Sequence, residues 1–209
     1  YLYTPATSNS NIQIVNGIDL DGEGGMVWIK RRDSTAYPVI VDTERGGQNV
    51  IYPHESYPNT ANTSIVQSFN SNGFTTGTTS YVSVADSDTV SWTFRKKEKF
   101  FSIITYTGNS ATDQTINHNL GSTPAFMLVK RTDATGAWNV YHTSMGNQKY
   151  AFLNSSEPVG GPYSNLNWAV TDTTFSADGY IAANNDGATY VAYLFADNSS
   201  EDAEEQMIK

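Results

Sequence analysis

The segment Phe126-Met-Leu-Val-Lys-Arg-Thr-Asp133 decides the fold, because a close copy of it stands one hundred residues earlier. That copy reads Met26-Val-Trp-Ile-Lys-Arg-Arg-Asp33, an apolar run that also ends in Lys-Arg-x-Asp. At this single offset further residues are identical, giving the pairs Lys30/Lys130, Arg31/Arg131, Asp33/Asp133, Thr43/Thr143, Gly46/Gly146 and Gln48/Gln148. Identities held in one register indicate an internal duplication. We therefore expect two homologous units.

The composition favours a turn-rich β protein. Charged residues make up only 16% of the 209-residue chain, while four Trp, thirteen Tyr and nine Phe supply bulky side chains for a core. Aromatic residues are enriched in strands, and a helical bundle or a disordered chain would carry more charge. This profile predicts an all-β fold.

The duplication predicts two antiparallel β-sandwich units of jelly-roll or concanavalin-like type, over residues 1–99 and 100–198. An acidic tail or linker follows over residues 199–209, in which Ser199 or Ser200 could cap a short helix. The alternative is that both halves close one concanavalin-like sandwich, since strand periodicity does not separate the two arrangements.

The last strand of each unit shows the clearest alternation. In Val90-Ser-Trp-Thr-Phe94 the apolar residues recur at every second position, which predicts that Val90, Trp92 and Phe94 face the core. Val191, Tyr193 and Phe195 repeat this face in the second unit. We therefore expect Trp92 and Tyr193 to be buried equivalents. Two tight turns are also predicted, at Asn72-Gly73 and at Asp178-Gly179.

Charge and cysteine usage exclude several classes of protein. The net charge of −9 argues against nucleic acid as a partner, because binding to a duplex depends on clustered cations. The chain has no cysteine, and therefore no disulfide framework and no thiol-based metal site or nucleophile. No apolar stretch is long enough to span a membrane, so we expect no membrane insertion. The chain begins at Tyr1 without a signal-type segment, which is compatible with a piece of a longer protein.

Catalytic and metal-binding motifs with useful specificity are lacking. None of the three histidines has a neighbour at metal-ligand spacing, and no nucleophile elbow or phosphate loop occurs. Asp19, Asp21 and Glu23 have the spacing that begins a calcium loop, but the distal Glu of that motif is missing, which favours a plain acidic turn. Asp86 and Asp88 could hydrolyse sugars, yet the second unit has no counterpart. We expect no catalytic residues, no metal and no cofactor, and hence no enzyme.

Two repeated polar positions are explained by structure more readily than by function. His142 occupies the position of Asp42, so a polar residue stands at this strand end in both units. The Lys-Arg-x-Asp feature could bind an acidic ligand or an adjacent subunit. Local turn contacts are favoured, because unrelated binding would not need the feature in both copies.

A loop in the second unit is the best candidate for ligand or partner binding. Between Gln148 and Phe175 the chain is six residues longer than between the corresponding Gln48 and Phe69. Loops tolerate insertions and often carry function. The candidate binding residues in this loop are Tyr163, Asn165, Asn167 and Trp168, a mixture suited to stacking on sugars or docking a partner. The alternative is that Trp168 folds back onto the core.

Several runs resemble a recurrent domain found, often in tandem, in predicted tail and other virion proteins of marine and environmental tailed bacteriophages. The resemblance lies in Phe101–Asn109, Thr115–Gly121, Phe126–Asp133, Trp138–Gly146 and Ala188–Phe195, with matching runs in the first unit, and it covers most of residues 1–198. It implies a virion setting, but no catalytic residues.

The function expected from the resemblance is a non-enzymatic virion structural module in a tail fibre, tail spike or surface appendage. Host-surface attachment is a further expectation, with other virion proteins, further copies of the chain and a host glycan as partners. One alternative is a carbohydrate-binding module of a secreted or cell-surface protein, marked by exposed aromatic residues. Another is a glycan-cleaving enzyme, which needs two facing carboxylates in a cleft.

Overall fold

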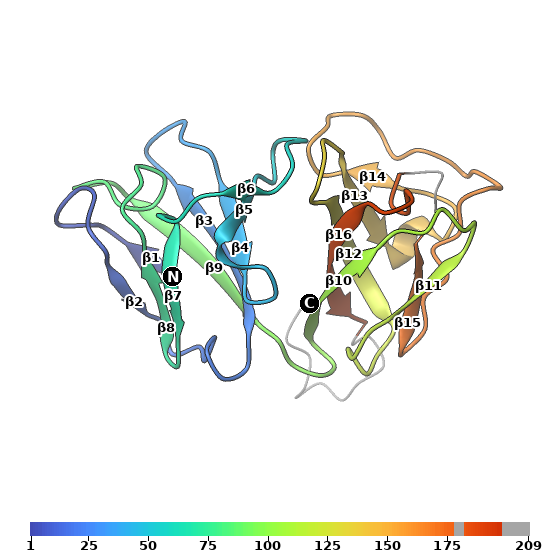
Figure 1. Ribbon diagram of the computed structural model, residues 1–209, viewed down its shortest axis with the longest axis horizontal. Helices are drawn as coiled ribbons and strands as arrows, with labels where there is room; N and C mark the ends of the chain where they lie inside the picture. Colours follow the sequence, from blue (N-terminus) through green and yellow to red (C-terminus); the bar gives the residue numbers. More distant parts are fainter. Residues whose placement is uncertain (178–181, 198–209) are drawn as a thin grey trace. The chain divides into compact units, whose positions relative to one another are not determined.

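A computed structural model of the chain describes residues 1–177 and 182–197. These residues form antiparallel strands joined by turns and loops, with a single short 3-10 helix (Figure 1). The predicted all-β class is therefore confirmed. The chain divides into two compact units, Tyr1–Lys96 and Lys97–Lys209. The predicted Asp178-Gly179 turn and the segment 199–209 lie outside the described residues.

Unit 1 is built from two sheets. The larger has the strand order β1-β9-β3-β4-β5-β6 and the smaller the order β2-β8-β7. Their bounds are β1 Leu2–Tyr3, β2 Gln13–Val15, β3 Gly25–Arg31, β4 Val39–Asp42, β5 Gly46–Ile51, β6 Thr60–Ala61, β7 Val66–Asn70, β8 Gly73–Thr76 and β9 Thr89–Arg95.

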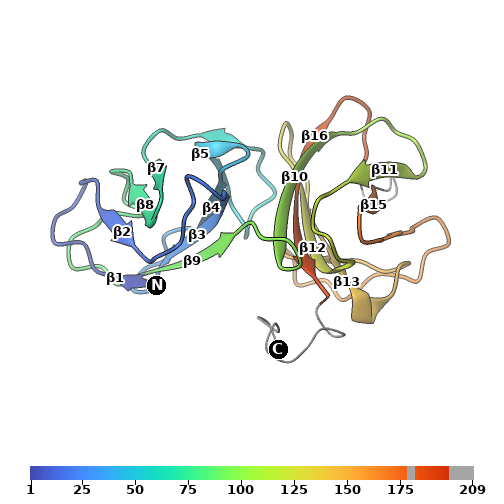
Figure 2. The same ribbon diagram turned by 90° about the horizontal axis from the view of Figure 1, so that it is seen from below.

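Unit 2 also has a larger sheet, of order β10-β16-β12-β13-β14, and a smaller one formed by β11 and β15. The bounds are β10 Phe101–Thr107, β11 Gln114–Asn117, β12 Pro124–Arg131, β13 Trp138–His142, β14 Ala151–Phe152, β15 Thr174–Ala177 and β16 Thr189–Ala196, with the 3-10 helix η1 at Thr143–Met145. Figure 2 shows the larger and smaller sheets of this unit as separate layers.

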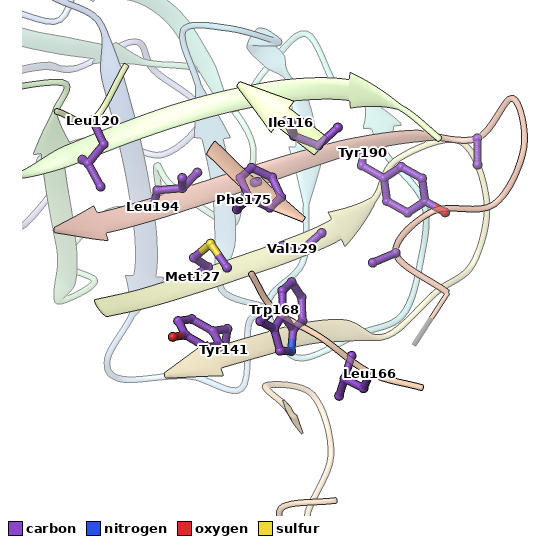
Figure 3. Packing of buried hydrophobic residues seen from close by; sticks show 13 residues of the cluster. Ile116, Leu120, Met127, Val129, Tyr141, Leu166, Trp168, Phe175, Tyr190 and Leu194 are labelled. Carbon is purple, nitrogen blue, oxygen red and sulfur yellow. The ribbon is translucent and has the colours of Figure 1, made fainter. Parts of the chain in front are cut away.

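Each core lies between the two sheets of its unit. In unit 1 the alternate residues Val27 and Ile29 of β3 pack with Ile14 and Phe74 of the smaller sheet. Unit 2 repeats this arrangement with Met127 and Val129 of β12, Ile116 of β11 and Phe175 of β15, with Tyr141, Tyr190 and Leu194 around them (Figure 3). Strand alternation places these residues on one face of each sheet.

The larger sheets of the two units correspond in strand order over the five strands β1-β9-β3-β4-β5 and β10-β16-β12-β13-β14. In each, the first strand pairs with the last, and the last pairs with the strand that carries Lys-Arg-x-Asp. Trp28 lies opposite Trp92, and Leu128 lies opposite Tyr193 at the corresponding place. A duplication would produce such correspondences, and it stays a prediction.

The predicted core face is wrong for both last strands, β9 and β16. Thr89 and Ser91 of β9 are buried, and Ser91 lies opposite the core residue Ile29, so these small polar residues face the core of unit 1. Trp92 lies on the other face, 46% exposed, with its ring 6.0 Å from that of Trp28. In unit 2 the core cluster takes Tyr190, Ala192 and Leu194 from β16, so Tyr193 lies on the opposite face of the strand, although its side chain is buried as predicted. Alternation finds the two faces of a strand, but the position of the second sheet decides which of them becomes the core face.

Candidate functional site

The lysine of the Lys-Arg-x-Asp feature folds back onto the loop that follows its strand. Lys30 Nζ donates to the carbonyl oxygens of Arg31 and of Ser34, the latter at 2.8 Å. In unit 2 the buried Lys130 donates to the carbonyl oxygen of Arg131 at 2.7 Å. Both ammonium groups thus donate hydrogen bonds to backbone carbonyl groups at or just after the end of their strand, which is a structural role.

The aspartate of the same feature ties this loop to the start of the last strand. Asp33 accepts a hydrogen bond from Ser87 Oγ at 2.8 Å, and Asp133 accepts one from the Thr189 N–H at 3.1 Å. Arg131 also donates to Asp133 through Nε and Nη2, at 2.9 and 3.0 Å. These contacts are the local turn contacts expected for the Lys-Arg-x-Asp feature, as opposed to contacts with an acidic ligand or an adjacent subunit.

Acid should weaken these ties. The hydrogen bond from Arg131 is the main cause that lowers the pKa of Asp133, and that from Ser87 lowers the pKa of Asp33. An aspartate whose folded pKa is lowered contributes stability that is present above its unfolded pKa of about 3.9 and is lost as the pH falls through the folded value.

Asp133→Asn should therefore flatten the pH dependence of unfolding below about pH 4. Urea denaturation of parent and variant at a series of acidic pH values measures this. Identical slopes for the two proteins would contradict the role of Asp133.

The aligned polar residues Asp42 and His142 have the same structural role at the ends of β4 and β13, where each accepts a backbone hydrogen bond. Asp42 accepts the Arg45 N–H at 2.8 Å, and His142 Nδ1 accepts the Ser144 N–H at 3.1 Å. Each side chain therefore caps the turn that follows its strand. Asp42 additionally forms a buried ion pair with Arg45, whose Nη2 lies 2.6 Å from Asp42 Oδ2.

Local contacts also account for His118 in unit 2 and for Asp19 in unit 1. His118 is buried beside Phe175, and burial lowers its pKa. In the acidic segment, Asp19 accepts the Gly22 N–H at 2.7 Å, as in a local turn. Residues 1–177 and 182–197 contain no group of three or more His, Asp or Glu side chains that could hold a metal ion.

Trp168 is not part of an exposed recognition surface, and the corresponding prediction is wrong. Its side chain is fully buried, with its ring 5.8 Å from that of Tyr141 (Figure 3). The reason is alternation along an extended segment, in which Leu166 and Trp168 point into the core while Asn165 and Asn167 are exposed. The segment is held by the Trp168 N–H, which donates to the Asn147 carbonyl at 2.9 Å.

Tyr163 instead belongs to a partly exposed row of rings, here called the ledge, formed by Tyr150, Phe152 and Tyr163. The ring of Tyr150 lies 4.9 Å from that of Phe152, and it stacks on Tyr163 at 6.0 Å with an interplanar angle of 23°. Tyr163 is 36% exposed. Backbone hydrogen bonds fix the ledge, because Tyr163 N–H donates to the Gln148 carbonyl at 3.0 Å.

A shallow groove adjoins the ledge along the chain. It is lined by Met145, Gly146, Asn147, Gln148, Lys149, Pro162 and Asn167. Of the four candidate residues, the structure thus places Tyr163 on the ledge, Asn167 in the groove and Asn165 on the exposed side of the same segment. Sequence reasoning missed Tyr150 and Phe152. Their spacing of two residues was the available signal, since it puts both rings on one face.

The flat rings, amide groups and lysine of the ledge and groove suit recognition of a polar ligand with an apolar face. Stacking uses the ring faces, and amides both donate and accept hydrogen bonds. No helix in the described part of the chain has the length and apolar character needed to cross a membrane.

Residues 2–200 match the model of a protein family described as "Domain of unknown function (DUF7483)", and the chain therefore belongs to this family. No curated protein matches the chain, and no solved structure does.

Proposed function

We propose that this member of a family without an assigned function is a non-enzymatic structural module of a phage virion that attaches to glycans on a host surface. The ledge is the observation that carries the attachment. The exposed amides of Asn165 and Asn167 follow Tyr163 along the chain, and backbone hydrogen bonds hold this segment in place. A preformed site loses less conformational entropy when it binds.

Sugar rings fit this surface chemically. A pyranose has one face of C–H groups, which stacks on the face of a tyrosine, and a rim of hydroxyl groups that bond to amides and charged groups. Tyr163 offers the face, while Asn167 and Lys149 offer the polar partners. Because these groups line an open groove, a chain of sugars can extend along it.

The virion setting is supported by the resemblance of the strand motifs to the phage domain, and it includes association with other virion proteins or further copies of this chain. The seven-residue strand β10 lies at an edge of its sheet. Such an edge can pair with another chain. The second candidate function is a carbohydrate-binding module of a secreted or cell-surface protein, which the ledge favours equally.

Tyr163→Ala tests the attachment. Loss of the stacking face should lower affinity for a bound polysaccharide by about tenfold, equivalent to about 1.4 kcal/mol. An array of bacterial surface polysaccharides identifies a binding partner, and titration of parent and variant measures the change. The control is Tyr57→Ala, which removes another exposed tyrosine outside the ledge. If the parent binds no polysaccharide, or if Tyr163→Ala binds like the parent, the proposed role of the ledge is wrong.

The setting requires a separate experiment. Electron microscopy and mass spectrometry of purified phage particles should locate the protein in the particle. Its presence there supports the virion module, whereas an isolated secreted protein that binds sugar supports the second candidate.

A further inference from the structure

Unit 1 carries a second aromatic surface, formed by Tyr37, Tyr52, His54 and Tyr81 and here called the tyrosine cluster. The Tyr37 ring lies 4.4 Å from the ring of His54 and is nearly parallel to that of Tyr81, at 6.4 Å and 13°. Tyr52 contacts all the other three rings, at 6.2–6.3 Å. The cluster joins the loops that follow β3, β5 and β8.

The exposure of the cluster differs from that of a core. Tyr52 is 9% exposed and packs against the core of unit 1, whereas Tyr37 is 46% exposed, and His54 and Tyr81 are partly exposed. Tyr52 thus anchors the cluster to the core, and the other three rings remain partly exposed to solvent. Exposed aromatic groups of this kind mark interaction sites on soluble proteins.

His54 supplies polar groups whose hydrogen-bonding capacity is unused. Neither of its ring nitrogens has a hydrogen-bond partner among the described residues, and Nε2 lies 3.7 Å from Glu55 Oε1. An imidazole has both donor and acceptor capacity, and buried polar atoms are normally satisfied. Rotation of this ring toward a bound hydroxyl group would satisfy them.

The tyrosine cluster and the ledge are built on corresponding strand ends. Tyr52 and Phe152 stand one hundred residues apart, at the offset of the repeated segments. Tyr52 immediately follows β5, which pairs with β4, and Phe152 ends β14, which pairs with β13. The strands β4 and β13 are those that end at Asp42 and His142. Each unit therefore extends an aromatic surface from the same part of its sheet, completed by a different loop.

We propose that the tyrosine cluster is a second sugar-binding site, so that the chain holds a polysaccharide through one site in each unit. The inference rests on the proposed attachment function and adds that each chain has two binding sites. Tyr37 and Tyr81 stack on the apolar face of a pyranose, and His54 bonds to its hydroxyl groups. Two linked weak sites bind a repeating polymer more tightly than either site alone, by factors of about 10²–10⁴ where both engage together.

The test uses the full chain, with the polysaccharide that binds most strongly in the array and a hexasaccharide released from it. Calorimetry of the parent with the hexasaccharide should give two sites per chain. Tyr37→Ala and Tyr163→Ala should each reduce this to one, and the double variant should bind none. Affinity for the intact polysaccharide should fall by at least about tenfold in each single variant.

Controls separate folding from binding. Tyr57→Ala removes a tyrosine that is as exposed as Tyr37, and it should bind like the parent. His54→Ala removes the imidazole while it leaves Tyr52 in place, and it should weaken binding at the same site as Tyr37→Ala. Circular dichroism confirms the fold of each variant.

The outcomes distinguish the two proposals. One hexasaccharide per chain, with binding unaffected by Tyr37→Ala and His54→Ala, overturns the second site and leaves the attachment function standing. Absence of binding by the parent to every polysaccharide of the array overturns both.

Discussion

Replacing Arg45 with leucine is expected to destabilise unit 1 by about 3–5 kcal/mol. The carboxylate of Asp42 is fully buried and accepts hydrogen bonds from Arg45, among them one from Nε at 2.7 Å. The same guanidinium donates to the Asn49 carbonyl and to Asn59 Oδ1, at 3.0 and 2.9 Å. The variant removes the group that neutralises a buried charge, and this costs more than the loss of a surface pair.

Chemical denaturation combined with hydrogen exchange of unit 1 amides measures the loss. The matched control is Lys96→Leu, which breaks the partly exposed pair of Lys96 with Glu44 next to the same hairpin. A pair of this kind contributes about 0–1 kcal/mol. If Arg45→Leu destabilises the unit no more than Lys96→Leu does, the buried pair does not hold the hairpin.

Trp168→Ala is expected to lower the stability of unit 2 by about 3–5 kcal/mol, because it removes the largest type of side chain from the core and leaves a cavity. Trp168 is fully buried among Tyr141, Leu166 and the residues of β12. Thermal and urea denaturation measure this loss. Tyr163→Ala provides the contrast, since it removes a partly exposed ring and should cost about 1 kcal/mol.

A second variant tests the chemistry of the same position. The indole N–H of Trp168 has no hydrogen-bond partner in the described part of the chain. Trp168→Phe keeps an aromatic ring and removes this donor, so it should be much less destabilising than Trp168→Ala. If Trp168→Ala melts like the parent, the burial of this loop segment in the core is wrong.

The repeated features were the part of the fold that sequence could predict. The strands that carry Lys-Arg-x-Asp, and the turn at Asn72-Gly73, depend on local signals. At Gly73, φ is 148° and a Cβ would lie 1.9 Å from the carbonyl oxygen of Ile14, so only glycine fits. The structure shows β7 and β8 joined at this turn, with Phe69 opposite Phe74.

The error about the last strands arose where distant contacts decide the outcome. The larger sheet of unit 1 has bulky residues on both faces, and the smaller sheet covers the face with Ser91 rather than the one with Trp92. For Trp168 a local signal did exist. The alternation of Asn165, Leu166, Asn167 and Trp168 puts the two apolar residues on one side, which is the pattern of a segment lying along a core.

The pairing of the first strand with the last has a consequence for how such a chain can grow. β1 lies beside β9, and β10 lies beside β16, so the polypeptide enters and leaves each unit at neighbouring strands. Neighbouring ends are what allow domains to be inserted or circularly permuted. In an additional copy inserted at such a boundary, the first strand would pair with the last strand of the same copy. A chain of such units could therefore gain or lose whole units while each existing sheet stayed intact.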